Sequence, residues 1–177
     1  MSNALLAKAA RIRLFLFDVD GVLTDGTVVM HADGSESKGF NIRDGAAIVW
    51  AQRAGLTVGL LSARSSGATA HRAAQLAVRI VEQGVKSKLK AYEQIARDVR
   101  IADTEIAYMG DDLLDLPVLA RVGLSAAPAD AAAEVRERVD WISTYGGGRG
   151  AVRELIELVL RAQRRWDDVL RQYVSQE

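Results

Sequence analysis

The stretch Ile12-Arg-Leu-Phe-Leu-Phe17, followed at once by Asp18-Val-Asp20-Gly21, decides the fold. Its core is short and apolar, and it stops abruptly at acidic residues and a glycine, which is typical of a fully buried strand that meets a loop. Segments of the same kind recur along the chain, with helical patterns between them. Alternating strands and helices predict a parallel β-sheet with helices on both faces.

The expected elements can be placed along the whole chain. Strands are expected at residues 12–17, 57–61, 78–81, 106–109, 122–125 and 140–142. Helices are expected at residues 45–54, 65–76, 87–99, 113–121, 129–138 and, as one long helix, about 151–173. Residues 26–40 break the alternation, because two β-prone arms flank the turn signal Ala32-Asp33-Gly34 and predict a projecting β-hairpin.

The composition limits the class of protein. The 177 residues are 49% hydrophobic, which suits a single domain over residues 1–177 and excludes a disordered chain. Lysine plus arginine and aspartate plus glutamate number 23 each, so no net charge attracts nucleic acid or a membrane. The absence of cysteine and the presence of two histidines argue against disulfides and zinc hydrolase chemistry. Lys8, Arg11 and Arg13 interrupt the apolar N-terminus, so we expect no export signal and a cytoplasmic protein.

The last quarter of the chain contains two further features. Apolar residues at helical spacing end near Ala162, so a tail is expected from about residue 162 to residue 177, with Trp166 as an exposed ring or a contact between subunits. The run Gly146-Gly-Gly-Arg-Gly150 is too short to separate domains. It is expected to be a flexible connection, in which Arg149 is a candidate contact for an anionic substrate.

Acidic residues follow two of the predicted strands. Asp18 and Asp20 lie two apart at the carboxyl end of the first strand, so both can face the crevice where ligands bind in open α/β sheets. Asp111 and Asp112 directly follow the fourth strand, and Asp115 comes soon after. If the two strands are neighbours, these carboxylates converge and repel one another unless a cation lies between them. Carboxylate and carbonyl oxygens are the ligands that Mg²⁺ prefers, so Mg²⁺ is the expected cofactor.

Hydroxyl and cationic side chains follow two more of the predicted strands. Ser62 follows the second strand, and Lys86 and Lys88 follow the third. Carboxylates, a metal ion, a hydroxyl and a lysine around one crevice suit phosphoryl transfer. Asp18 would then attack phosphorus to form an aspartyl-phosphate, while Asp20 would protonate the leaving alkoxide and later deprotonate the attacking water.

Four ordered segments carry a family resemblance. Asp18-Val-Asp20-Gly-Val-Leu-Thr-Asp-Gly26, Ser62, a lysine near residue 88 and Gly110-Asp-Asp112 resemble the four motifs of haloacid dehalogenase (HAD) superfamily phosphatases. Phe40-Asn-Ile-Arg-Asp-Gly45, Leu61-Ser-Ala-Arg64 and Gly147-Gly-Arg-Gly-Ala-Val-Arg-Glu154 are similar to the branch that hydrolyses 3-deoxy-D-manno-octulosonate 8-phosphate (KDO 8-phosphate). The resemblance covers most of the chain. It implies a Rossmann-like α/β fold without a large cap domain, a homotetramer, and KDO release for lipopolysaccharide biosynthesis.

The resemblance also implies roles for single residues. Mg²⁺ would be held by the carboxylates of Asp18 and Asp111 and the backbone carbonyl of Asp20, while Asp112 and Asp115 orient these ligands. Ser62 and Lys88 would bind the phosphoryl group. The residues expected to read the sugar acid are Asn41, Ile42, Arg43, Asp44, Gly45, Arg64, Arg72 and Lys88.

Some alternatives stay open. Asp112 and Asp115 also fit simple helix caps, and Lys86 competes with Lys88 as the phosphate lysine. The branch commonly carries an arginine where this chain has Val49, so a phosphatase for another sugar phosphate, such as a nine-carbon keto-acid 9-phosphate, is the nearest rival. A HAD-like subunit that only assembles into a larger complex is the rival of a different class.

The absence of a cap predicts that other copies of the chain cover the site. A small domain of this kind leaves its crevice open to water, and phosphoryl transfer usually takes place under a lid. We expect the hairpin around Asp33 and Gly34 to cover the site of a neighbouring subunit, with the tail beyond Arg161 as a second wall.

Overall fold

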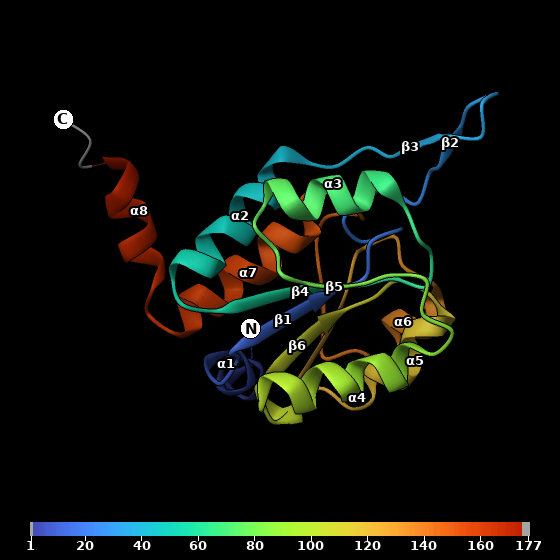
Figure 1. Ribbon diagram of the computed structural model, residues 1–177. Helices are drawn as coiled ribbons and strands as arrows, with labels where there is room; N and C mark the ends of the chain where they lie inside the picture. The colour runs from blue at the N-terminus through green and yellow to red at the C-terminus, as the bar shows by residue number, and fades with distance from the viewer. Residues whose placement is uncertain (1, 175–177) are drawn as a thin grey trace.

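A six-stranded parallel sheet forms the centre of the computed structural model, which describes residues 2–174 (Figure 1). Its strand order is β5-β4-β1-β6-β7-β8, and every pair is parallel. The sheet strands are β1 (Leu14–Phe17), β4 (Thr57–Leu61), β5 (Ile80–Glu82), β6 (Ile106–Met109), β7 (Leu124–Ala127) and β8 (Trp141–Ile142). The predicted fold class is therefore confirmed.

Helices cover both faces of the sheet, as Figure 1 shows. The helices on one side are α1 (Asn3–Ala10), α2 (Ile42–Arg53), α3 (Gly67–Gln75) and α7 (Ala151–Ala162). Those on the other are α4 (Lys88–Val99), α5 (Leu116–Leu119) and α6 (Ala133–Arg136), with the 3₁₀ turns η1 (Asp103–Glu105) and η2 (Leu113–Asp115) beside them. A last helix, α8 (Trp166–Val174), packs on α7.

The central strand β1 explains the two layers. Phe15 and Phe17 point into the core formed with α1, α2 and α7, whereas Leu14 and Leu16 point into the core formed with α4 and α5. All four side chains are fully buried, as expected for alternating residues of a strand that is covered on both faces. This burial fixes the strand and therefore the position of Asp18, the next residue along the chain.

The predicted hairpin is confirmed. Strands β2 (Val29–Met30) and β3 (Glu36–Ser37) pair antiparallel and project from the body of the molecule (Figure 1). Gly34 adopts a φ of 84°, and its N–H donates to the carbonyl of His31, which closes the turn. Val29 and Met30 are more than half exposed in the single chain.

The C-terminal helix differs from the prediction of one element over residues 151–173. The chain leaves the helix after Ala162, because Arg164 takes a φ of 59° and the Arg165 N–H donates back to the carbonyl of Leu160. Gln163 anchors the break by donating its side-chain amide to the carbonyl of Ile12 at 2.7 Å. No glycine or proline marks this position, so the break has no local sequence signal.

Trp166 is also placed differently from the prediction. Its side chain is 7% exposed, and its ring meets that of Trp50 edge to face at 5.6 Å. Trp50 in turn donates its indole N–H to the hydroxyl of Tyr173. Trp166 is therefore a core residue that fixes α8 on α2, and residues 175–177 of the expected tail lie outside the described residues.

Three shorter segments also depart from the expectation. Helix α1 was not predicted; Ser2 accepts the N–H of Leu5 and caps its start. The helix expected at 113–121 begins as the turn η2 and continues as α5, which has Pro117 in its first turn. The helix expected at 129–138 is reduced to α6. None of the helices within residues 2–174 is long and apolar enough to cross a membrane.

Candidate active site

The carboxyl ends of the central strands surround a cleft of about 180 Å³. Strand β1 pairs with β4 on one side and β6 on the other, so the acidic segments after β1 and β6 are neighbours, as the sequence analysis required. The cleft is lined by Asp18, Asp20, Ser62, Ala63, Arg64, Lys88, Asp111, Asp112, Leu114 and Asp115. These include every residue expected to act on the phosphoryl group or to hold the metal.

Asp18 is fixed by both its backbone and its side chain. Its N–H donates to the carbonyl of Met109, which extends the parallel ladder by one residue. Its carboxylate lies 2.9 Å from the ammonium of Lys88, and both side chains are almost fully buried. Of the two candidate lysines, Lys88 therefore reaches the cleft, whereas Lys86 is exposed.

Asp115 anchors this arrangement from beneath. It is fully buried, and one of its oxygens accepts from Lys88 at 2.6 Å and from the hydroxyl of Tyr108. Its other oxygen accepts the N–H groups of Asp111 and Asp112. Asp115 thus orients two metal-site residues and the lysine, which goes beyond the helix cap considered above. Asp112, by contrast, does cap the turn η2 through the Leu113 N–H.

Asp111 has the free oxygen that a metal ion needs. Its Oδ1 is buried and has no hydrogen-bond partner, and single oxygens of Asp18, Asp111 and Asp115 lie within 4.8 Å of one another. Since the oxygens of Asp115 already accept four hydrogen bonds, Asp18 and Asp111 are the carboxylates that remain for a cation. This donor set, all oxygen and partly open, suits Mg²⁺.

The electrostatics of the cluster also favour the binding of a cation. Burial first, and then the charges of Asp18 and Asp115, raise the pKa of Asp111 to about 8. Burial and the charge of Asp115 raise the pKa of Asp18 to about 6, against the lowering effect of Lys88. Burial lowers the pKa of Lys88, but the charges of Asp18 and Asp115 raise it overall. A divalent ion would stabilise the ionised form of both acids.

The loop after β1 positions Asp20. Gly21 turns the chain with a φ of 88°, and a Cβ there would lie 2.1 Å from a carboxylate oxygen of Asp111, so only glycine fits. A Cβ on Gly147 would lie 1.9 Å from the carbonyl oxygen of Gly21. The run 146–150 is therefore not a flexible connection, because it packs closely against this loop. Gly148 also donates its N–H to the carbonyl of Val22.

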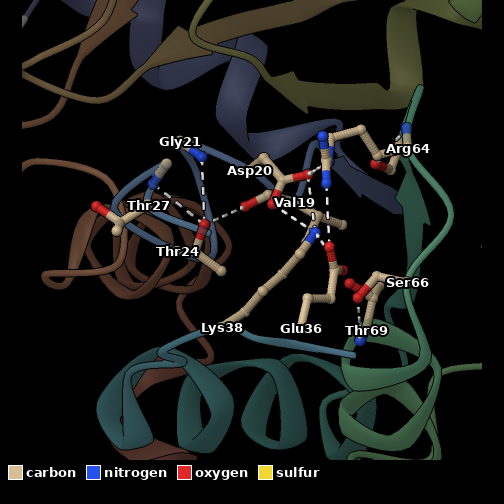
Figure 2. A network of polar contacts seen from close by, with 12 residues as sticks. Val19, Asp20, Gly21, Thr24, Thr27, Glu36, Lys38, Arg64, Ser66 and Thr69 are labelled. Atoms are coloured by element: carbon tan, nitrogen blue, oxygen red, sulfur yellow. Dashed lines mark hydrogen bonds and ion pairs between the residues drawn. The ribbon is translucent and has the colours of Figure 1, made fainter. Parts of the chain in front are cut away.

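Lys38 is the site residue that sequence reasoning missed. Figure 2 shows the carboxylate of Asp20 facing Lys38 and Arg64, with Glu36 beside both cations. Lys38 donates to both oxygens of Asp20, at 2.6 and 2.9 Å. The available signal was the alternation of Glu36 and Lys38, which places both side chains on one face of the hairpin arm.

Ser62 lies where the prediction placed it. The residue is 2% exposed at the end of β4, and its N–H donates to the carbonyl of Glu82 on β5. Its hydroxyl accepts the N–H of Arg64, which holds the loop after β4 against the cleft.

Most residues expected to read the sugar lie outside this cleft. Asp44 is 1% exposed and accepts the N–H groups of Gly150 and Arg153, so its side chain holds the start of α7 and does not line this cleft. Burial raises the pKa of Asp44 against these hydrogen bonds. Asn41 caps α2 and donates its amide to the carbonyl of Gly148.

The remaining expected contacts are spread over the neighbouring surface. Ile42 is 81% exposed, and Arg43 lines a separate hollow with Arg149. The guanidinium of Arg72 covers Gly45 and donates to the carbonyl of Asn41. In the single chain, therefore, Arg64 and Lys88 are the expected sugar contacts that line the cleft.

Comparisons with known proteins agree with this geometry. Residues 59–155 match the family of haloacid dehalogenase-like hydrolases. The chain is 42% identical to the 3-deoxy-D-manno-octulosonate 8-phosphate phosphatase KdsC of Escherichia coli K12 over 168 residues, which is 95% of this chain and 89% of that protein. The crystal structure of the corresponding phosphatase from Yersinia pestis gives a TM-score of 0.93 at 38% identity and covers 94% of this chain and 90% of the other. The Moraxella catarrhalis phosphatase, solved with magnesium, phosphate and KDO, gives a TM-score of 0.95 at 34% identity, covering 98% and 99%.

Proposed function

This chain belongs to the haloacid dehalogenase-like hydrolases, in the family of KDO 8-phosphate phosphatases, and on that premise we propose that it hydrolyses KDO 8-phosphate to KDO and phosphate. One observation carries the chemistry. A buried carboxylate, Asp18, lies at the end of β1 between a buried lysine and a second acid with an unpaired oxygen. This is the arrangement that a nucleophilic carboxylate beside a metal-bound phosphate requires.

The cofactor is Mg²⁺. Asp18 and Asp111 would hold it with their carboxylates, and Asp20 with its backbone carbonyl, as the family resemblance implies. When bound, it neutralises phosphoryl oxygens and allows an anionic nucleophile to approach them. Ser62, at the end of β4, and Lys88, at the start of α4, would contact the same phosphoryl group.

The proposed reaction has two steps. In the first, an oxygen of Asp18 forms a bond to phosphorus, the bond from phosphorus to the sugar oxygen breaks, and Asp20 gives that oxygen its proton. In the second, Asp20 takes a proton from water, and the water oxygen displaces Asp18 from phosphorus. Phosphate leaves, and both aspartates return to their starting states.

The architecture around Asp18 supports this assignment. Asp18 directly follows β1, whose four residues are fully buried, and Lys88 is held beside it by Asp115, which also accepts the hydroxyl of Tyr108. These contacts already hold Asp18 and Lys88 side by side, and such preorganisation reduces the reorganisation needed in the transition state.

We infer that the active assembly is a homotetramer in the cytoplasm, in which hairpins cover neighbouring sites and complete the contacts to the sugar acid. The support is the open cleft, the projecting hairpin with exposed Val29 and Met30, and the position of Arg43 and Arg72 outside the cleft of their own chain. Light scattering that finds only monomer at micromolar concentration, with full activity, would refute this assembly.

Phosphate release from a panel of sugar phosphates, with and without Mg²⁺, tests the proposed function. The panel contains KDO 8-phosphate, a nine-carbon keto-acid 9-phosphate and a neutral hexose 6-phosphate. We expect the highest kcat/KM on KDO 8-phosphate and no turnover in the presence of EDTA. A preference for the neutral sugar phosphate would contradict the assignment of KDO 8-phosphate as the substrate. Turnover without a divalent ion would contradict the proposed metal-dependent mechanism.

A further inference from the structure

The acid–base residue Asp20 lies in a closed ring of four charges (Figure 2). Lys38 and Arg64 approach its carboxylate at 2.6 and 3.5 Å, and Glu36 lies 3.8 Å from Lys38 and 3.0 Å from Arg64. When Asp20 is ionised, cations and anions alternate around the ring and its formal charge is zero. Within the described residues, Lys38 and Arg64 are the only side-chain cations within 4.0 Å of Asp20.

The two cations are not equivalent. The Lys38 side chain is fully buried and donates to both oxygens of Asp20, whereas the Arg64 side chain is 53% exposed and contacts one of them at longer range. A buried ammonium with two hydrogen bonds to one carboxylate restricts that carboxylate strongly, because any rotation breaks a charged hydrogen bond. Lys38 is therefore the contact that sets the orientation of Asp20.

The hairpin provides this contact within its own chain. Glu36 is the first residue of β3, and Lys38 is the residue directly after that strand. Asp20 lies in the loop after β1. The base of the hairpin is thereby tied to the acid–base residue, independently of any neighbouring subunit that its tip covers.

We propose that Lys38 is a positioning residue for Asp20: it holds the carboxylate at the angle from which a proton reaches the leaving sugar oxygen. The inference rests on the proposed function, because it assigns Lys38 to the acid step of that reaction. Lys38 itself touches neither the phosphoryl group nor the metal site, since it is absent from the lining of the cleft.

Replacing Lys38 by methionine should release Asp20. The remaining partner, Arg64, is shared with Glu36, so the carboxylate would turn toward it and away from the leaving group. A displacement of about 1 Å at a reacting group can reduce the rate about 10²-fold. The loss of rate should be confined to substrates whose leaving oxygen must be protonated.

Leaving-group dependence separates positioning from a merely structural role. A sugar alkoxide leaves only when it is protonated, whereas 4-nitrophenolate leaves without a proton. The ratio kcat/KM reports the steps up to release of the leaving group. Lys38→Met should therefore lower kcat/KM about 10²-fold on the best alkyl phosphate of the panel and less than about threefold on 4-nitrophenyl phosphate.

Further variants complete the experiment. Lys90→Met removes an exposed lysine on α4 and should leave both values unchanged. If Lys38→Met does not fold, as judged by its thermal transition, Lys38→Gln takes its place, because the amide keeps a donor but carries no charge. In an Asp20→Asn background, Lys38→Met should cause no additional loss of kcat/KM, because the effects of substitutions at residues that act through one another are not additive.

The outcomes are distinct. A loss confined to the alkyl phosphate, absent in the Asp20→Asn background, supports the inference. An equal loss on both substrates, no loss on either, or an additive loss in the Asp20→Asn background overturns it. The test uses whichever alkyl phosphate the protein hydrolyses, so a wrong sugar assignment leaves it intact, whereas a wild type that releases no phosphate at all would refute the proposed function and the inference with it.

Discussion

We expect the metal-free protein to lose stability as the pH rises from 6 to 8, and Asp111 to be the cause. In an unfolded chain an aspartate ionises near pH 3.9. In the folded protein, burial and the charges of Asp18 and Asp115 raise the pKa of Asp111 to about 8. Between these values the folded state holds a proton that the unfolded state has lost, so each increase in pH favours unfolding. The protonated Asp111 therefore contributes its full stability below the pKa that it has in the unfolded chain. This contribution is lost as the pH rises through the pKa that it has in the folded protein.

The magnitude follows from this difference in proton binding. One pKa unit corresponds to about 1.4 kcal/mol, and integration from pH 6 to a folded pKa of about 8 gives about 2 kcal/mol. Asp111 is half-buried and solvent screens part of the effect, so the expected range is about 1–2 kcal/mol. For a chain of 177 residues this is a fall in Tm of roughly 2–8 °C. Asp18, with a pKa of about 6, titrates mainly below this window.

Thermal unfolding at pH 6 and pH 8, in EDTA and in saturating Mg²⁺, provides the assay. In EDTA, Asp111→Asn should lose most of the fall in Tm because it removes the titrating group. Asp112→Asn is the matched control: it changes the adjacent, exposed acid and keeps an oxygen for the cap of η2. It should retain most of the fall, because the charge of Asp112 is the smallest of the causes that raise the pKa of Asp111. With Mg²⁺ the wild-type fall should disappear, because the ion binds the ionised carboxylates of the folded state. A metal-free wild type that is equally stable at both pH values, or an Asp111→Asn variant with the wild-type fall, would refute the reasoning.

Four further substitutions test other parts of the structure. Asp18→Asn should abolish phosphate release and Asp20→Asn should slow it about 10²- to 10⁴-fold, with the fold intact by circular dichroism; wild-type rates in either would contradict its assigned step. Asp44→Ala leaves two backbone N–H groups at the start of α7 unpaired, so urea unfolding should show a loss of about 2–4 kcal/mol, whereas full stability would contradict its role as an anchor. Trp166→Ala should cost about 3–5 kcal/mol by the same measurement, and a loss below about 1 kcal/mol would mean that α8 does not contribute to the core.

The sheet and its acidic edge were predictable from local sequence. The run Leu14–Phe17 is apolar at every position, which only a strand covered on both faces requires, and the abrupt change at Asp18 marks where that strand reaches solvent. Parallel strands place their carboxyl ends at one edge of the sheet, so Asp18, Asp111 and Ser62 were expected to meet if their strands were neighbours, which the strand order confirms.

Other features depend on contacts between distant segments and leave no local signal. The break after Ala162 is fixed by Gln163 reaching the carbonyl of Ile12, about 150 residues earlier in the chain. Asp44 resembled a substrate contact because it lies in a motif beside Arg43, yet its partners are N–H groups at the start of α7. Periodicity describes one element at a time and therefore does not reveal which backbone groups a polar side chain will satisfy.

The two aspartates that we propose as catalytic residues are held in different ways, and the difference matches the step proposed for each. Asp18 is attached to the buried end of β1 and faces Lys88, which Asp115 and the hydroxyl of Tyr108 hold beneath it. These contacts come from strands and buried groups, so the attacking oxygen keeps one position relative to phosphorus, as an in-line displacement demands.

Asp20 is held by a side chain from a projecting hairpin and one from the loop after β4. An acid–base group gives up a proton in one step and takes one in the next, so its partners must stabilise its orientation without enclosing it. A ring of alternating charges with zero formal charge does this, because it supplies hydrogen bonds to the carboxylate while leaving its edge open to the cleft. The base of the hairpin, whose tip is predicted to cover a neighbouring site, therefore contacts the proposed acid–base residue of its own chain.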